Sequence, residues 1–173
     1  MANYKELLQH ITTFVFDYDG VLTEGIVMLT EDGEPLRSAN VRDGYALQLA
    51  VKKGYRIAVI SGGNSPSMSR RLSSLGITDI FLGVQHKVRV FEKYLKDNNI
   101  EPTEVVYMGD DIPDFHVMKM VAVPACPADA AEEIRAISKY ISHYNGGKGC
   151  VRDIIEQVLK LQNKWMNDDA FKW

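Results

Sequence analysis

Short, almost wholly apolar runs alternate along the chain with longer segments in which apolar residues recur every three or four positions. Short apolar runs bounded by turn residues are typical of buried strands. The predicted strands lie at 12–17, 55–60, 80–82 and 104–108. The longer segments have the spacing of amphipathic helices, and they lie at 43–53, 65–75 and 86–98. Strands that alternate with helices predict an α/β fold, in which helices cover both faces of a central parallel sheet.

The same alternation continues, in shorter pieces, through the last third of the chain. We expect a short helix through Val117 and Met118, strands at 121–123 and 140–141, and helices at 129–137 and 150–161. After the last predicted helix, we expect the stretch 163–173 to be a loose tail, as terminal segments commonly are. Gly146-Gly-Lys-Gly149 lacks the full spacing of a phosphate-binding P-loop. It is therefore interpreted either as a flexible connector or as a segment that reaches a neighbouring subunit's site.

One segment breaks the alternation of strands and helices. Two short extended runs, 26–30 and 35–40, flank Glu31-Asp32-Gly33-Glu34, and Asp-Gly between such runs predicts a β-hairpin. The hairpin is either an ordinary edge or, because exposed strand edges invite pairing, a contact between subunits. After it, Asp43 is expected to cap the next helix, which ends at Gly54.

Composition narrows the classes of function without selecting one. The chain has 173 residues, enough for a single domain spanning 1–173. A formal net charge of −3 gives no broad basic surface for nucleic acid. Cys126 and Cys150 lack the spacing of a metal site, so we expect free, buried thiols. No signal peptide and no apolar run of about 20 residues are found, which predicts a cytoplasmic protein without membrane contact.

Polar residues suited to chemistry follow the predicted strands. In a parallel sheet the carboxyl ends of all strands lie at one edge, where ligands bind. The residues expected to meet there are Asp17, Asp19, Ser61, Lys87, Asp110 and Asp111. Two acids as close as Asp17 and Asp19 repel each other, so a bound cation is expected.

This set of side chains is suited to phosphoryl transfer. Carboxylate oxygens favour Mg²⁺, which also accepts phosphate oxygens as ligands. A lysine and a hydroxyl can hold the remaining phosphate oxygens. One carboxylate can attack phosphorus, and a second can give a proton to the leaving group and later activate water.

Four segments resemble, in order and spacing, the motifs of the haloacid dehalogenase superfamily. They are Asp17-Tyr-Asp19-Gly-Val-Leu-Thr23, Ile60-Ser61-Gly62, Lys87 and Gly109-Asp110-Asp111-Ile-Pro-Asp114. The resemblance implies a three-layer Rossmann-like fold, with Asp17 as nucleophile and Asp19 as general acid/base. It implies Mg²⁺ on Asp17, the Asp19 carbonyl and Asp110, with support from Asp111 and Asp114. Ser61, Gly62 and Lys87 would hold the phosphoryl group.

The short segments after Thr23 and Ser61 leave no room for a cap domain. Among capless members, this chain resembles the 3-deoxy-D-manno-octulosonate 8-phosphate (KDO 8-phosphate) phosphatases. The resemblance lies in Asn40-Val-Arg42-Asp43-Gly44, Arg71 and the late Gly146-Gly-Lys-Gly149. The resemblance implies a homotetramer formed through the hairpins, a phosphorylated sugar acid as substrate and a role in lipopolysaccharide biosynthesis. It places Arg71 on the substrate carboxylate, with Arg42 and Thr23 as further substrate-binding residues.

Other functions stay open on the sequence alone. At the position of Gly63, many relatives that act on the eight-carbon substrate have arginine, and relatives that act on nine-carbon substrates tend to have glutamate. The alternative functions are therefore phosphatases of 2-keto-3-deoxy-nononate 9-phosphate or N-acylneuraminate 9-phosphate. The absence of the glutamate favours the eight-carbon substrate. The non-enzymatic alternatives are a phospho-receiver and an oligomerisation module. A receiver places its phosphorylated aspartate after the third strand, and nothing acidic follows residues 80–82 directly.

Overall fold

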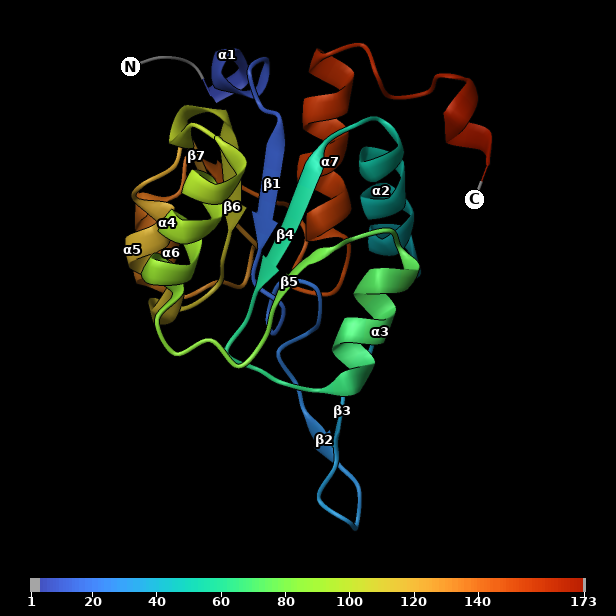
Figure 1. Ribbon diagram of the computed structural model, residues 1–173, viewed down its shortest axis with the longest axis vertical. Helices are drawn as coiled ribbons and strands as arrows, with labels where there is room; N and C mark the ends of the chain where they lie inside the picture. The colour runs from blue at the N-terminus through green and yellow to red at the C-terminus, as the bar shows by residue number, and fades with distance from the viewer. Residues whose placement is uncertain (1–3, 173) are drawn as a thin grey trace.

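The computed structural model describes residues 4–172 and contains a parallel six-stranded sheet between two layers of helices (Figure 1). The strand order is β5-β4-β1-β6-β7-β8, and each adjacent pair is parallel. The strands are β1 (Thr13–Phe16), β4 (Arg56–Ile60), β5 (Asp79–Phe81), β6 (Val105–Met108), β7 (Val123–Cys126) and β8 (Tyr140–Ile141). The chain adds strands on one side of β1 and then on the other. The switch point, where such folds bind ligands, therefore lies at the carboxyl end of β1.

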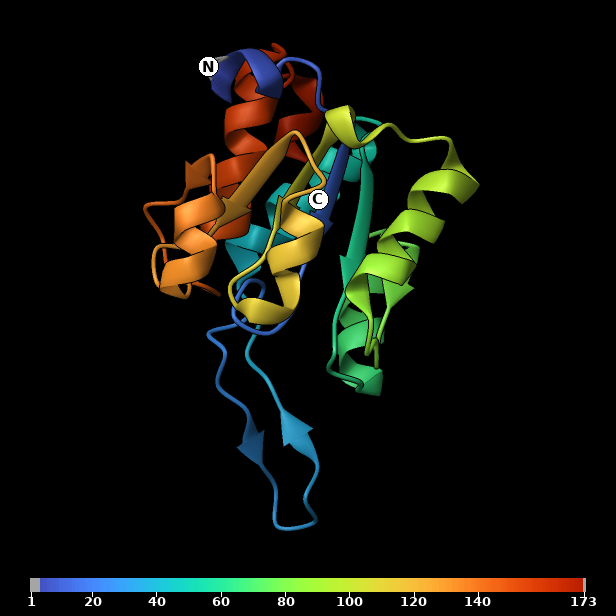
Figure 2. The same ribbon diagram turned by 90° about the vertical axis from the view of Figure 1, so that its left-hand side faces the viewer.

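Helices cover both faces of the sheet, as the sequence predicts. One layer contains α1 (Tyr4–Leu8), α2 (Val41–Lys52), α3 (Pro66–Ser74) and α7 (Cys150–Leu161). The other contains α4 (Lys87–Asn98), α5 (Phe115–Met118) and α6 (Glu132–Ile137). The described residues also form short 3₁₀ segments: η1 (Pro102–Glu104), η2 (Ile112–Asp114) and η3 (Asp168–Phe171). Figure 1 shows the two layers on either side of the sheet, and Figure 2 looks onto the layer of α4, α5 and α6.

The central strand β1 explains why its sequence is apolar throughout. Phe14 and Phe16 pack into the α2/α3/α7 layer, and Val15 packs into the α4/α5/α6 layer. All three side chains are fully buried, because both faces of a central parallel strand are covered. The core therefore fixes the position of Asp17, the next residue of the chain.

The start of α2 differs from the prediction. The helix cap is Asn40, whose side chain accepts hydrogen bonds from the backbone N–H groups of Arg42 (2.8 Å) and Asp43 (3.2 Å). Asp43 as the cap is therefore wrong, because Asn40 already supplies the side-chain acceptor that a helix N-terminus needs. Asp43 is buried instead and accepts a hydrogen bond from the backbone N–H of Arg152 at 2.7 Å, which joins the starts of α2 and α7.

The predicted hairpin is present and projects beyond the carboxyl ends of the central strands (Figures 1 and 2). It consists of β2 (Met28–Leu29) and β3 (Pro35–Leu36), which pair antiparallel. Its apolar side chains face solvent, with exposed fractions of 66% for Ile26, 60% for Met28 and 70% for Leu29. A stripe of this kind is typical of a surface that another protein chain covers.

The described part of the C-terminal stretch, up to residue 172, is packed against α2. The prediction of a loose tail is wrong there, because aromatic and ionic contacts fix it. The Tyr45 hydroxyl donates to the Ala170 carbonyl, Lys53 pairs with Asp169 at 2.8 Å, and the Trp165 ring meets the Tyr45 ring edge-on at 6.4 Å. Across residues 4–172, none of the helices has the length and apolar character that crossing a membrane requires.

Candidate active site

A cavity of about 500 Å³ lies at the carboxyl ends of the central strands. Asp17 and Asp19 line it from the loop after β1, Ser61 and Gly62 from the end of β4, and Lys87 from the start of α4. Asp110, Asp111 and Asp114 line it from the segment after β6. The structure thus brings together most of the predicted residues, because parallel strands end at one edge.

Asp17 is held in place by the backbone and by a lysine. Its N–H donates to the Met108 carbonyl at 3.0 Å, which continues the pairing of β1 with β6. Its Oδ1 accepts from the backbone N–H of Tyr18 at 2.6 Å and lies 3.0 Å from Nζ of Lys87. Burial and the charge of Asp114 raise the pKa of Asp17 well above its usual value, and Lys87 opposes this rise. A cation at the site would therefore favour the ionised form.

Asp114 connects Lys87 with the interior of the sheet. Its Oδ1 accepts hydrogen bonds from Nζ of Lys87 at 2.7 Å and from the hydroxyl of Tyr107 at 2.6 Å. Burial lowers the pKa of Lys87, but the adjacent charges of Asp114 and Asp17 outweigh it and leave the pKa above its ordinary value. The sequence gives no signal for Tyr107, because an aromatic residue inside an apolar strand is expected to be core.

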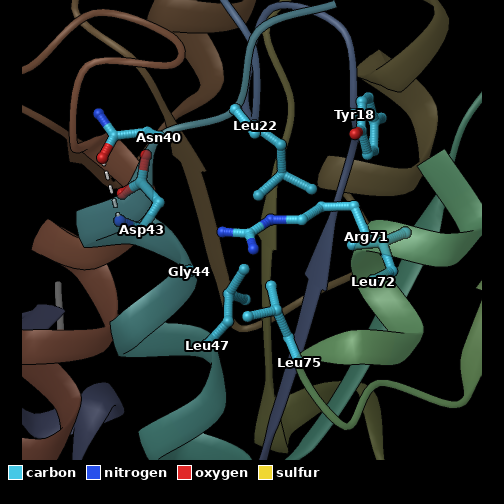
Figure 3. A pocket seen from close by; sticks show the side chains of 10 residues that line it. Tyr18, Leu22, Asn40, Asp43, Gly44, Leu47, Arg71, Leu72 and Leu75 are labelled. Atoms are coloured by element: carbon cyan, nitrogen blue, oxygen red, sulfur yellow. Dashed lines mark hydrogen bonds between the residues drawn. The ribbon is translucent and has the colours of Figure 1, made fainter. Parts of the chain in front are cut away.

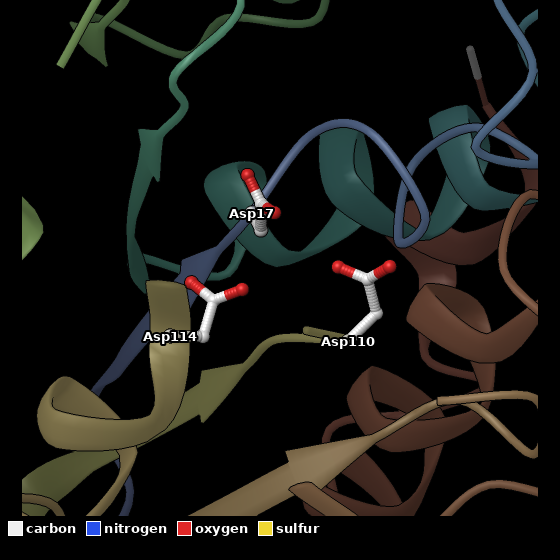
Figure 4. A group of neighbouring side chains, drawn as sticks. All are labelled: Asp17, Asp110 and Asp114. Carbon is white, nitrogen blue, oxygen red and sulfur yellow. The ribbon is translucent and has the colours of Figure 1, made fainter. Parts of the chain in front are cut away.

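The carboxylates of Asp17, Asp110 and Asp114 face one another (Figure 4). One oxygen from each lies within 4.8 Å of the others. Burial and the charges of Asp114 and Asp111 raise the pKa of Asp110 to about 7. Oδ2 of Asp114 is buried and has no hydrogen-bond partner among the described residues. Three converging carboxylates with an unpartnered oxygen are the donor set that suits a hard cation such as Mg²⁺.

Gly20 shows how closely the loop after β1 packs against Asp110. A Cβ at this position would lie 1.9 Å from Oδ2 of Asp110, and its φ of +84° is also unfavourable for other residues. Glycine at position 20 therefore allows the loop after β1 to approach Asp110. Asp111 is exposed and its Oδ1 caps η2 by accepting from the N–H of Ile112 at 2.8 Å. The contribution of the Asp19 carbonyl to the metal stays a prediction.

Asp19 is bound by an arginine that sequence reasoning missed. Arg37 follows β3 and donates from Nε to Oδ1 of Asp19 at 2.7 Å and from Nη2 to Oδ2 at 3.0 Å. Thr23, predicted to bind substrate, is buried and donates from Oγ1 to the same Oδ1 at 3.3 Å. Arg37 lies 18 positions from Asp19 in the sequence, so no local pattern indicates the pair.

Ser61 and Gly62 lie where a phosphoryl group can reach them. Ser61 is buried at the end of β4, and its N–H donates to the Phe81 carbonyl at 2.9 Å. Its Oγ accepts from the N–H of Gly63 at 3.1 Å. The hydroxyl hydrogen is thus free to be donated to a ligand in the cavity.

Arg71 and Arg42 are not among the residues that line the Asp17 cavity in the described chain. Arg71 extends from α3 into a separate small pocket beside Gly44 and Leu47 (Figure 3). A Cβ on Gly44 would lie 2.4 Å from Nη2 of Arg71, so glycine makes room for the guanidinium. Arg42 is exposed on the first turn of α2 and lines a third pocket with Lys148. Their contact with substrate stays a prediction.

The glycine-rich segment 146–149 is closely packed, which excludes the flexible connector. The N–H of Gly147 donates to the Val21 carbonyl at 2.9 Å, and Lys148 pairs with Glu24 at 2.7 Å. A Cβ on Gly146 would lie 1.9 Å from the Gly20 carbonyl oxygen. The segment therefore packs against the loop after β1 and supports it.

The site can be compared with known proteins. A family model of haloacid dehalogenase-like hydrolases matches residues 44–126. The 3-deoxy-D-manno-octulosonate 8-phosphate phosphatase KdsC of Escherichia coli K12 is 33% identical over 156 residues, which cover 90% of this chain and 83% of the relative. The chain belongs to this phosphatase family.

Solved structures of this phosphatase family agree in fold over nearly the whole chain. The Moraxella catarrhalis phosphatase, in complex with magnesium, phosphate and KDO, is 33% identical with a TM-score of 0.91, and the match covers 99% of this chain and 97% of that one. The cobalt-bound phosphatase of Haemophilus influenzae is 29% identical with a TM-score of 0.89, covering 95% and 98%. The family and the capless fold expected from the motifs are thereby confirmed.

Proposed function

We propose that the chain is a Mg²⁺-dependent phosphatase that hydrolyses KDO 8-phosphate to KDO and phosphate, a step of lipopolysaccharide biosynthesis. The observation that carries the proposal is the convergence of Asp17, Asp110 and Asp114 with Lys87 at the carboxyl end of β1. Family membership supports it, since the relatives act on this sugar acid phosphate or bind its product.

Each side chain in the cavity has a role in the proposed reaction. Asp17 attacks phosphorus, and the bond between phosphorus and the sugar oxygen breaks as Asp19 gives that oxygen a proton. Water then attacks the aspartyl-phosphate, passes a proton to Asp19 and releases phosphate. Ser61, Gly62 and Lys87 hold phosphate oxygens as charge shifts. Mg²⁺, which Asp17, Asp110 and Asp114 would hold, supplies positive charge for the carboxylates and the transferring group.

The proposed substrate is tested with a panel of phosphate esters. Phosphate release is measured with KDO 8-phosphate, 2-keto-3-deoxy-nononate 9-phosphate and N-acylneuraminate 9-phosphate, each with Mg²⁺ and with EDTA. We expect the highest kcat/KM with the eight-carbon ester and loss of turnover in EDTA. A preference for a nine-carbon ester would reject the proposed substrate. Release of a single equivalent from every ester would instead favour the receiver.

Arg71 has a separate test. If its guanidinium pairs with the sugar-acid carboxylate, Arg71→Ala lowers kcat/KM for KDO 8-phosphate about tenfold or more. For p-nitrophenyl phosphate, which has no carboxylate, the kcat/KM of Arg71→Ala stays within about threefold of the wild-type value. Arg70→Ala is the matched control on the same helix, because Arg70 is exposed and bonds to the Pro66 carbonyl at 3.3 Å. Equal losses on the two substrates would remove Arg71 from carboxylate recognition.

We propose that the chain acts as one domain and forms a homotetramer through the hairpin. The exposed apolar side chains of Ile26, Met28 and Leu29 support an association there. We also place the enzyme in the cytoplasm, where a reducing environment suits its two free, buried cysteines.

A further inference from the structure

Arg37 makes a contact that its position in the sequence does not suggest. It directly follows the second strand of the hairpin, yet only 9% of its side chain is exposed. Its Nε and Nη2 each donate to a different oxygen of Asp19, at 2.7 and 3.0 Å. Such a two-bond pair fixes the plane of the carboxylate as well as its distance, which a lysine cannot do.

The absence of a side chain at Gly63 leaves room for the ion pair between Arg37 and Asp19. A Cβ on Gly63 would lie 2.9 Å from Oδ2 of Asp19 and 3.2 Å from Nη2 of Arg37. The pair therefore occupies the space that a side chain at position 63 would need. Nη1 of Arg37 is buried and has no hydrogen-bond partner in the part of the chain that the structure describes. An arginine held in this way is not a solvated surface charge.

We propose that Arg37 is a positioning residue that holds the carboxylate of Asp19 for proton transfer. The inference rests on the proposed role of Asp19 as general acid/base. It also makes the hairpin part of the active site, because Arg37 directly follows β3. Thr23 adds a second donor to Oδ1 of Asp19, at 3.3 Å.

The chemistry gives this pair a function in both half-reactions. When the bond between Asp17 and phosphorus forms and the bond to the sugar oxygen breaks, Asp19 gives its proton to that oxygen and becomes an anion, which Arg37 stabilises. When water attacks the aspartyl-phosphate, the phosphorus bond to Asp17 breaks and the water proton passes to Asp19. The bidentate pair then presents Asp19 as the carboxylate that accepts this proton.

Two substrates without a carboxylate separate this role from substrate binding. Butyl phosphate has a leaving group that must be protonated, whereas p-nitrophenolate leaves without a proton. The ratio kcat/KM includes only steps up to formation of the aspartyl-phosphate, so it isolates the step in which Asp19 acts as acid. We expect Arg37→Ala to lower kcat/KM about tenfold or more for butyl phosphate and less than about threefold for p-nitrophenyl phosphate.

Conservative variants and controls complete the test. Arg37→Lys is expected to lose less kcat/KM than Arg37→Ala, again with the larger loss on butyl phosphate. Added guanidinium is expected to restore part of the activity of Arg37→Ala on butyl phosphate. Arg70→Ala is expected to match the wild type. If Arg37→Ala fails to fold, Arg37→Lys on the same two substrates decides. Equal losses on both substrates, or no loss on either, would overturn the proposal.

Asp19→Asn separates a failure of this inference from a failure of the proposed function. It is expected to show the same preference for the good leaving group, because it lacks the transferable proton. If Asp19→Asn shows that preference and Arg37→Ala does not, Asp19 is the acid and Arg37 does not position it. If Asp19→Asn lowers kcat/KM equally for both substrates, the proposed role of Asp19 as the acid is wrong, and this inference falls with it.

Discussion

Asp114 contacts Lys87, which we propose to bind phosphate, and belongs to the carboxylate group that we propose to bind the metal. Its Oδ1 accepts from Lys87 and Tyr107, and its buried Oδ2 has no hydrogen-bond partner among the described residues. One of its two oxygens lies within 4.8 Å of an oxygen of Asp17 and an oxygen of Asp110. Tyr107 thereby orients a carboxylate that would bind the metal. Partners that orient metal ligands commonly change metal affinity by 10- to 100-fold when removed.

Tyr107→Phe is therefore expected to fold normally and to bind Mg²⁺ about tenfold more weakly, with a similar loss of kcat. Mg²⁺ titration of activity measures both effects. The matched control is Tyr94→Phe, which loses a hydroxyl bonded to Asp79 at 3.2 Å, away from the cavity. Equal Mg²⁺ requirements for wild type and Tyr107→Phe would exclude this role.

Asp43 gives a pH dependence to stability that does not involve the cavity. Burial raises the pKa of Asp43 from 3.8 to about 6, and the N–H bonds from α7 offset only part of this rise. Between these pH values the folded chain binds a proton that the unfolded chain has released, so stability falls as pH rises from about 4 to 6. The change corresponds to at most about 3 kcal/mol.

Asp43→Asn is expected to remove this dependence, because the amide oxygen can still accept from Arg152 but does not ionise. Relative to the variant, the wild type should lose up to about 3 kcal/mol of unfolding free energy between pH 4 and pH 7. Urea unfolding at several pH values in EDTA measures the difference. Parallel curves for the two proteins would show that Asp43 does not titrate in this range.

At the scale of elements, the hairpin is notable because its apolar side chains are not covered by the rest of the described chain. Within residues 4–172 its strands pair with each other and with no other strand, and Met28 and Leu29 are mostly exposed. Association through this stripe would bury apolar surface, which stabilises the assembly by about 25 cal/mol per Å² removed from water. Since Arg37 follows β3, the same contact would reach the active site.

Leu29→Lys is expected to prevent the association and to leave the domain folded, because the side chain is 70% exposed. Sedimentation velocity should show a smaller species than the tetramer that we propose for the wild type. The control Phe171→Lys makes the same kind of exchange at a residue that is 72% exposed in the C-terminal segment, and should sediment as wild type. An unchanged Leu29→Lys assembly would place the interface elsewhere.

The elements themselves were largely predictable from the sequence, and their ends less so. Apolar runs such as 104–108 correspond to strands because both sheet faces are covered, and 150–161 matches α7 in both bounds. The start of α2 was missed because Asn40 and Asp43 are both suitable caps, and only the fold shows which one faces the free N–H groups. The packed tail was missed because its aromatic contacts are with a distant helix.

At the scale of the whole molecule, the residues that we propose to carry the reaction lie at one edge of the sheet. Asp17, Ser61, Lys87 and Asp110 could be predicted because each follows a strand and all parallel strands end together. Tyr107 and Arg37 could not, because an apolar strand and a hairpin give no local sign of a tertiary contact. The phosphatase chemistry therefore follows from topology, and its fine positioning follows from contacts between distant segments.

The most direct test of this account is multiple-turnover phosphate release from KDO 8-phosphate by Asp17→Asn in the presence of Mg²⁺. We expect the loss of essentially all activity, on the order of 10³-fold or more, because the amide cannot form the covalent intermediate. Asp97→Asn, at an exposed aspartate paired only with Lys93 on α4 among the described residues, should retain wild-type turnover. Wild-type turnover by Asp17→Asn would contradict the account.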